Sequence, residues 1–65
     1  MPHIKKHRIM IVDDHTLFRS GLRYIVEATG LYEVCGEASN GAEFLAMLEE
    51  QQPDLFILDI NMPVM

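Results

Sequence analysis

The chain has 65 residues, 49% of them hydrophobic and 23% charged, so it holds enough apolar material to fold and is not a disordered tail. Ten acidic residues against five basic ones give a net charge of −5, which argues against direct binding to nucleic-acid phosphates. The single cysteine, Cys35, excludes an internal disulfide framework and a cysteine zinc cluster, and it fits a reducing cytoplasm. The basic start leads into only four apolar residues before Asp13, so it is neither a signal peptide nor a transmembrane span.

The first half of the chain predicts a strand followed by a helix. Ile9–Val12 is a fully apolar run ended by Asp13 and Asp14, which is typical of a strand buried on both faces. A helix is predicted over Thr16–Ala28, with Gly30 in the position of a left-handed residue after its end. The apolar stripe of this helix consists of Phe18, Leu22, Ile25 and Val26, whereas Arg19, Arg23 and Glu27 fall off the stripe.

The second half predicts a strand, a helix and another strand. Tyr32–Ala38 alternates as an edge strand does, with Tyr32, Val34, Gly36 and Ala38 on one side and Glu33, Cys35 and Glu37 on the other. Asn40 followed by Glu43 resembles a capping box that starts a helix whose apolar stripe is Gly41, Phe44, Leu45 and Leu48, and Pro53 marks the end of this helix. Leu55–Leu58 is a second fully apolar run, closed by Asp59.

This order of strand, helix, strand, helix, strand predicts an α/β fold. The crossovers have the length that parallel βαβ units need, so we expect a doubly wound parallel sheet with right-handed crossovers. Residues 1–7 are expected to form a polar leader, and residues 8–65 one continuous unit. A lone cysteine in an edge strand, such as Cys35, is expected to be a small buried hydrophobe.

Acidic residues end both fully apolar strands, and ligands of open parallel sheets collect outside the carboxyl ends of strands. If the first and third strands are neighbours, Asp13, Asp14 and Asp59 meet there, repel one another and need a cation. Hard oxygen ligands suit Mg²⁺, and a carboxylate beside such an ion can act as nucleophile toward a phosphoryl group. The alternative is that Asp13 or Asp14 only caps the first helix and that Asp59 only starts a turn.

A family resemblance goes further than this pattern. It rests on four ordered strings: Ile9-Met10-Ile11-Val12-Asp13-Asp14-His15, Gly36-Glu37-Ala38-Ser39-Asn40-Gly41, Pro53-Asp54-Leu55 and Leu58-Asp59-Ile60-Asn61-Met62-Pro63. From about Arg8 to Met65 the chain resembles the receiver domain of bacterial two-component response regulators, which has a flavodoxin-like (CheY-like) fold. Stretches 13–22 and 36–41 are similar to the NarL/LuxR-type transcriptional regulators, in which a helix-turn-helix DNA-binding domain usually follows the receiver.

The resemblance implies a role for each matching residue. Asp59 is expected to be the phosphoacceptor, which takes its phosphoryl group from a cytoplasmic sensor histidine kinase. Asp14 matches the principal metal-binding acid and Asp13 its neighbour, while the backbone carbonyl of Asn61 would complete the Mg²⁺ shell with Asp59. The resemblance assigns no role to the three histidines, and we expect His3 and His7 in a solvated tail and His15 at the helix start.

The resemblance also implies that the chain is the N-terminal half of a receiver. A complete receiver has two further strands, which supply a Ser or Thr and a Lys that bind the phosphoryl oxygens. In the family strand order, stopping after the third strand leaves that strand as a bare apolar edge. We therefore expect self-association, by strand-edge pairing, exchange with a second copy or docking on the missing half.

Three functions compete at this point. The first is a non-enzymatic signalling module that controls transcription through a DNA-binding domain absent from this chain. The second is an enzyme of the aspartyl-phosphate phosphatase type, but such enzymes have a second acid two residues after the nucleophile, where this chain has Asn61. The third is an inert fragment that acts only by association, forms dimers without Mg²⁺ and does not respond to Asp59→Asn.

Overall fold

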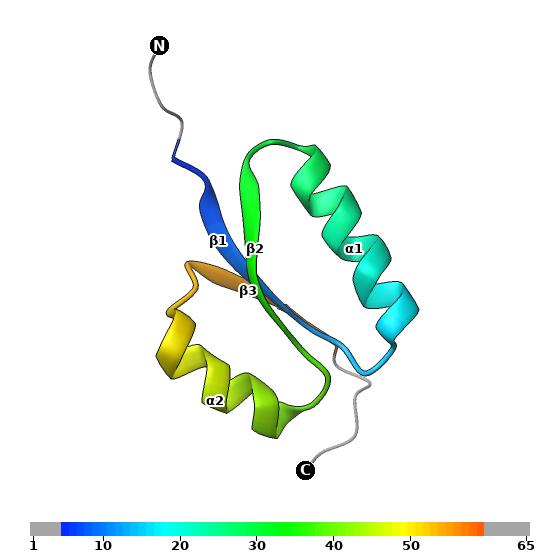
Figure 1. The fold of residues 1–65 in the computed structure, drawn as a ribbon, viewed down its shortest axis with the longest axis vertical. Helices are drawn as coiled ribbons and strands as arrows, with labels where there is room; N and C mark the ends of the chain where they lie inside the picture. The colour runs from blue at the N-terminus through cyan, green and yellow to red at the C-terminus, as the bar shows by residue number, and fades with distance from the viewer. Residues whose placement is uncertain (1–4, 60–65) are drawn as a thin grey trace.

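Three parallel strands and two helices make up the fold (Figure 1). The computed structural model describes residues 5–59. Its elements are β1 (His7–Val12), α1 (Thr16–Ala28), β2 (Tyr32–Ala38), α2 (Gly41–Gln51) and β3 (Leu55–Leu58). The strand order is β2-β1-β3 and both pairs are parallel, which confirms the predicted doubly wound sheet. Between residues 5 and 59, neither helix is long and apolar enough to cross a membrane.

The strand order puts the two helices on opposite faces of the sheet. The chain steps from β1 outward to β2 and then back across β1 to β3, so right-handed crossovers place α1 and α2 on different sides, as Figure 1 shows. β1 is the central strand, and Met10, Ile11 and Val12 are its fully buried residues. On the α2 face, Met10 and Val12 form the core with Ala38, against which Phe44 and Met47 pack.

The predicted element boundaries agree closely with the structure, and the main difference is at the start. The bounds of α1, β2 and β3 are those predicted, and α2 begins after Asn40 and ends before Pro53. β1 begins earlier than its apolar run, since His7, which was expected in a polar leader, pairs with Tyr32 of β2. The amide of His7 donates to the carbonyl of Leu31 at 3.0 Å. Backbone pairing therefore continues past the apolar residues that made the strand visible in the sequence.

A β-bulge in β2 makes the predicted side-chain alternation of this strand wrong. Ile9 pairs with Val34, but the next residue, Met10, pairs with Gly36, so Cys35 is the extra residue. Paired residues of parallel strands point to the same face, and a shift of one residue reverses every later side chain. Gly36 and Ala38 consequently lie on the α2 face, where Cys35 also packs, while Val34 and Glu37 lie on the α1 face.

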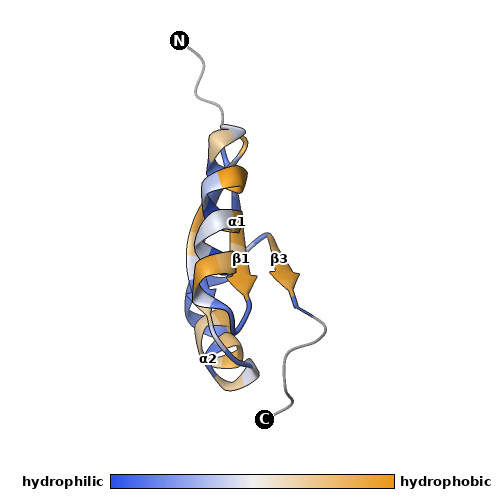
Figure 2. Ribbon diagram, turned by 90° about the vertical axis from the view of Figure 1, so that its right-hand side faces the viewer, coloured by the Kyte–Doolittle hydropathy of each residue, from blue (hydrophilic) through white to orange (hydrophobic). Residues whose placement is uncertain are grey.

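The predicted stripe of α1 is only half confirmed. Leu22 and Val26 are half-buried, but Phe18 is 59% and Ile25 is 64% exposed. The reason is that α1 lies against β2 and β1, so the flank of the helix that carries Phe18 and Ile25 is not covered. In α2 the situation is similar, because Leu45 of the predicted stripe is exposed. Figure 2, coloured by residue hydropathy, shows that hydrophobic residues recur along both helices and fill β3.

Each end of β3 is joined to β1. At its start, the amide of Asp54 donates to the carbonyl of Arg8 at 2.8 Å, and the amide of Arg8 donates to the Asp54 carboxylate, also at 2.8 Å. The guanidinium of Arg8 donates to the side-chain oxygen of Gln51 at the end of α2. At the other end, the amide of Asp59 donates to the carbonyl of Val12 at 3.0 Å. These bonds define the register of β3.

The predicted cap of α2 is present, with one change. Asn40 is the N-cap, and its side-chain oxygen accepts a hydrogen bond of 2.9 Å from the amide of Glu43. The Glu43 carboxylate accepts in return from the amide and hydroxyl of Ser39, one residue earlier than in a capping box. These bonds from Ser39 lower the pKa of Glu43 below its ordinary value. The stabilisation they provide is present above the ordinary pKa and is lost as the pH falls through the lowered one.

We expect Asn40→Ala to lower the free energy of unfolding by about 1 kcal/mol, because the amide of Glu43 loses its partner at the helix start. Asn40→Asp keeps an acceptor at this position and should cost less. Urea denaturation followed by circular dichroism measures both variants. Equal stability of Asn40→Ala and the parent chain would contradict a stabilising role for this cap.

Candidate functional site

The site lies at the carboxyl ends of the two neighbouring strands β1 and β3. Asp13 directly follows β1, and its amide donates to the carbonyl of Ala38 in β2 at 2.9 Å. Asp59 directly follows β3 and is joined to the end of β1 through its own amide. The strand ladder therefore continues one residue beyond each strand. Backbone hydrogen bonds alone fix the positions of both acids, without any contribution from their side chains.

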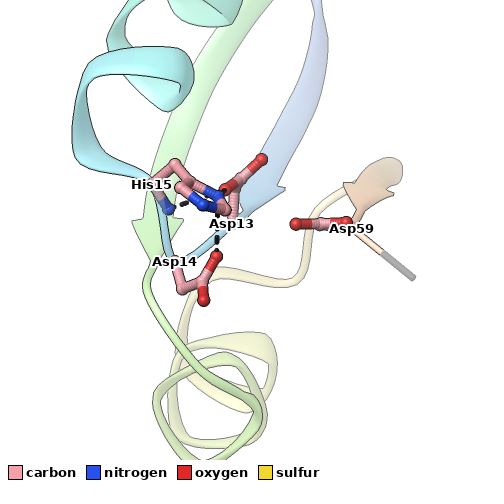
Figure 3. A group of neighbouring side chains, drawn as sticks. All are labelled: Asp13, Asp14, His15 and Asp59. Carbon is pink, nitrogen blue, oxygen red and sulfur yellow. Dashed lines mark hydrogen bonds and ion pairs between the residues drawn. The ribbon is translucent and has the colours of Figure 1, made fainter. Parts of the chain in front are cut away.

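The acidic side chains converge between these strand ends. In Figure 3, the carboxylate of Asp59 points from the end of β3 toward Asp13 and Asp14. Asp13, Asp14, His15 and Asp59 each offer one ligand atom, and these atoms all lie within 4.8 Å of one another. Asp13 is only 2% exposed, whereas Asp14 and His15 are exposed. The predicted meeting of Asp13, Asp14 and Asp59 is thus observed, while Asn61 lies outside the described residues.

His15 is a member of this cluster that the sequence did not indicate. It is the N-cap residue of α1, at the predicted helix start, but its ring also turns back toward the acids. Its Nδ1 lies 2.9 Å from a carboxylate oxygen of Asp14 and 3.2 Å from one of Asp13. When Nδ1 carries a proton, it donates to these carboxylates and offsets part of their mutual repulsion. No sequence signal beyond its position next to the two acids points to this contact.

The loop between β1 and α1 does not support the alternative that an aspartate only caps the helix. The N-cap of α1 has no side-chain hydrogen bond. Instead, the Asp13 carboxylate accepts from the amide of His15 at 2.7 Å, which forms a turn just before the helix. One oxygen of the buried Asp13 thereby shapes the loop.

The donor set fits a small hard cation. Ligands on opposite sides of Mg²⁺ lie about 4.2 Å apart, because each oxygen is about 2.1 Å from the ion. The span of the cluster, at most 4.8 Å, is close to this value, so small side-chain rotations would bring the oxygens to ligand distance, with waters in the remaining positions of the octahedral shell. Three carboxylates provide the oxygen ligands that Mg²⁺ prefers, and one nitrogen donor among them does not alter that preference.

Arg19 is a second residue to which the sequence analysis gave no role. It falls off the apolar stripe of α1, yet its side chain is only 14% exposed. Its Nη1 donates to the backbone carbonyl of Asp13, and its Nε donates to the carboxylate of Glu37 at 3.0 Å. Glu37 faces α1 because of the bulge at Cys35, so a pattern that assumes regular alternation cannot reveal this contact.

Comparison with known proteins agrees with this geometry. The model of the response regulator receiver domain matches residues 9–65. The chain belongs to the response regulator receiver family. It is 40% identical to the nitrate/nitrite response regulator protein NarL of Escherichia coli over 57 residues, which are 88% of this chain and 26% of that protein.

A solved structure shows the same fold. The signal receiver domain of the putative response regulator NarL from Mycobacterium tuberculosis superposes with a TM-score of 0.87 at 39% identity, covering 94% of this chain and 49% of that one. The chain is therefore a receiver of the NarL/LuxR type with the predicted fold. It spans about half of that solved chain and about a quarter of the curated transcriptional regulators that it matches.

Receivers also occur in proteins named as enzymes. The chain is 47% identical over 57 residues to protein-glutamate methylesterase/protein-glutamine glutaminase 3 of Hahella chejuensis, which are 88% of this chain but 16% of that protein. Similarity to a receiver therefore does not by itself define the output of the longer protein.

We expect Asp13→Ala to be less stable than Asp13→Asn by about 1–2 kcal/mol without metal. Both changes remove the same charge, but only asparagine keeps a side-chain oxygen that can accept the hydrogen bond from the amide of His15. Urea denaturation in the presence of a chelator compares the two variants directly. If their stabilities are equal, the hydrogen bond to His15 does not stabilise the loop.

Proposed function

We propose that this chain is the phosphoacceptor half of a two-component receiver and that Asp59 takes a phosphoryl group from a sensor histidine kinase. The observation that carries the proposal is the convergence of the Asp13, Asp14 and Asp59 carboxylates at the ends of β1 and β3 in a chain of the receiver family. In the proposed reaction, a carboxylate oxygen of Asp59 attacks phosphorus. A P–O bond forms as the bond between phosphorus and the histidine nitrogen of the kinase breaks.

The other acids would hold Mg²⁺. Asp14 is the exposed ligand and Asp13 the buried one, and the backbone carbonyl of Asn61 is the third protein ligand expected beside Asp59. When bound, Mg²⁺ would neutralise the charge that develops on the phosphoryl oxygens. Asp13 would also keep the loop in place, since one of its oxygens accepts from the amide of His15.

The longer protein would act on transcription. We propose residues 8–65 as the N-terminal half of the receiver, and a helix-turn-helix DNA-binding domain elsewhere in the parent protein as its output. Two supports are the relatives named as transcriptional regulatory proteins and the acidic charge of this chain, which is unsuited to binding DNA itself. A cytoplasmic location, where receivers meet their kinases, belongs to the same proposal.

We do not favour an enzyme of the phosphatase type. Such an enzyme needs a general acid two residues after the nucleophile, and the chain has asparagine at position 61. The amide of asparagine is too weakly acidic to give up a proton in that role. The chain is accordingly proposed to receive a phosphoryl group rather than to turn over a substrate.

Calorimetric titration with Mg²⁺ tests the metal site. We expect Asp14→Asn and Asp59→Asn each to weaken Mg²⁺ binding at least about tenfold, since each removes a carboxylate ligand. Mutation of a residue that only supports a metal ligand already lowers metal affinity by about tenfold. Glu49→Gln, which removes the same charge from the exposed part of α2, is the matched control. Loss of affinity in Glu49→Gln as large as in Asp14→Asn would show general attraction of cations rather than a site.

Intact mass spectrometry tests phosphoryl transfer. After incubation with acetyl phosphate and Mg²⁺, we expect one phosphoryl group on the chain and none on Asp59→Asn, because the acceptor oxygen is lost. The modification should be labile in alkali, as acyl phosphates are. Equal labelling of the chain and of Asp59→Asn would place the modification elsewhere and overturn the proposed role of Asp59.

We further propose that the chain, by itself, pairs with a second copy through the apolar edge, which we define as Leu55, Phe56 and Leu58 of β3. All three are exposed, and β3 is at the edge of the described sheet. A strand edge offers a row of backbone donors and acceptors to another chain. Pairing of two β3 edges about a two-fold axis would be antiparallel and would bring both copies of these side chains together.

Light scattering tests this association. We expect a dimer whose population rises with salt, because salt screens the repulsion between two chains of charge −5. Leu55→Lys places a charge on the edge and should shift the mass to monomer, whereas Leu17→Lys, at an 88% exposed residue of α1 outside the apolar edge, should not. Dimers that form equally in both variants, or a monomer under all conditions, would contradict pairing through β3.

A further inference from the structure

We propose that Arg19 is a positioning residue of the cation site, and that it holds the backbone of the β1–α1 loop in the geometry that Mg²⁺ binding requires. This inference rests on the proposed function of the acidic cluster. The side chain of Arg19 lies between α1 and the sheet, and its two bonds go to different elements. Nη1 donates to the carbonyl of Asp13, and Nε donates to Glu37 of β2 at 3.0 Å.

The contact with Asp13 is specific to Arg19. Arg23, one helical turn later, also reaches Glu37, with its Nη1 2.7 Å from the carboxylate, but its other partner is Glu27 of its own helix. The Arg23 side chain is 48% exposed, against 14% for Arg19. The two arginines therefore share a charge, a helix and an acidic partner, but of the two it is Arg19 that donates to the β1–α1 loop.

The bonds of Arg19 act on the peptide that joins the two metal-binding acids. The carbonyl of Asp13 belongs to the peptide unit that leads into Asp14, so a donor on this oxygen restricts the rotation of that unit. The carboxylate of Asp13 fixes the next peptide through the amide of His15. Glu37 anchors the guanidinium to β2, so the orientation of the loop is tied to the sheet rather than to the helix alone.

The sign of the effect separates positioning from electrostatics. A positive charge near a cation site opposes cation binding, so removal of either arginine should by charge alone strengthen Mg²⁺ binding slightly. If Arg19 positions the loop, its removal must weaken binding instead. Mutation of a residue that orients a metal ligand without binding the metal typically lowers metal affinity by about 10- to 100-fold.

The experiment compares Arg19→Gln, Arg19→Lys and Arg23→Gln with the parent chain. Circular dichroism first shows which variants are folded, and calorimetry then gives Mg²⁺ affinity. We expect Arg19→Gln to bind Mg²⁺ about tenfold more weakly and Arg23→Gln to bind as well as the parent or slightly more tightly. Arg19→Lys keeps one donor and the charge but loses the fork that reaches two partners, so it should recover part of the affinity.

Amide hydrogen exchange in the metal-free chain provides a second readout. Arg19→Gln should accelerate exchange at the amide of His15, which is bonded to Asp13, and Arg23→Gln should leave it unchanged. Unchanged or stronger Mg²⁺ binding by Arg19→Gln, or equal exchange in both variants, would overturn the proposal. A parent chain without Mg²⁺ affinity would contradict the proposed function instead, and the exchange comparison would still decide whether Arg19 orders the loop.

Discussion

Pairing of the central strand with both neighbours is the interaction on which the rest of this structure depends. β1 hydrogen-bonds to β2 along one side and to β3 along the other, and its last three residues are fully buried. Both acids that follow strands are bonded to this framework through their backbone amides. A change that loosened the end of β1 would therefore disturb the core and separate the acidic groups at the same time.

The acidic cluster costs free energy in the folded chain. Carboxylates within a few ångströms repel one another, and burial of Asp13 adds a desolvation penalty. The structure offsets this cost with fixed dipoles and charges, namely the amide of His15, the ring of His15 and the guanidinium on the Asp13 carbonyl. Such an arrangement is less stable than an apolar one would be, and the Mg²⁺ that we propose for it would stabilise the folded chain on binding.

Sequence patterns were sufficient for the elements and for most of the site. Acid-terminated apolar runs indicated adjacent strand ends, so Asp13, Asp14 and Asp59 could be grouped before any coordinates were known. The bulge at Cys35 was not predicted, although the neighbouring Gly36 is of the residue type that often marks a bulge inside a strand. Its consequence is large, since it turns Glu37 toward α1 and creates the partner that draws Arg19 out of solvent.

The apolar stripes failed for a different physical reason. Periodicity tells which side of a helix is apolar, but it does not tell whether the described sheet is wide enough to cover that side. Leu22 and Val26 are half-buried, whereas Phe18 and Ile25 of the same helix remain exposed. The pattern thus described the surface that a wider assembly would cover, rather than the contacts among residues 5–59.

The bonds between Arg8 and Asp54 at the start of β3 have a consequence for sequence drift. They fix the start of β3 against β1. The connection between α2 and β3 is the short segment after Gln51. An insertion or deletion in that segment would be absorbed before Asp54, and Asp59 would keep its place opposite Asp13. The same length change inside Leu55–Leu58 would displace Asp59 by about 3.3 Å. Among natural relatives, insertions and deletions should consequently occur before Asp54 and be rare between Asp54 and Asp59.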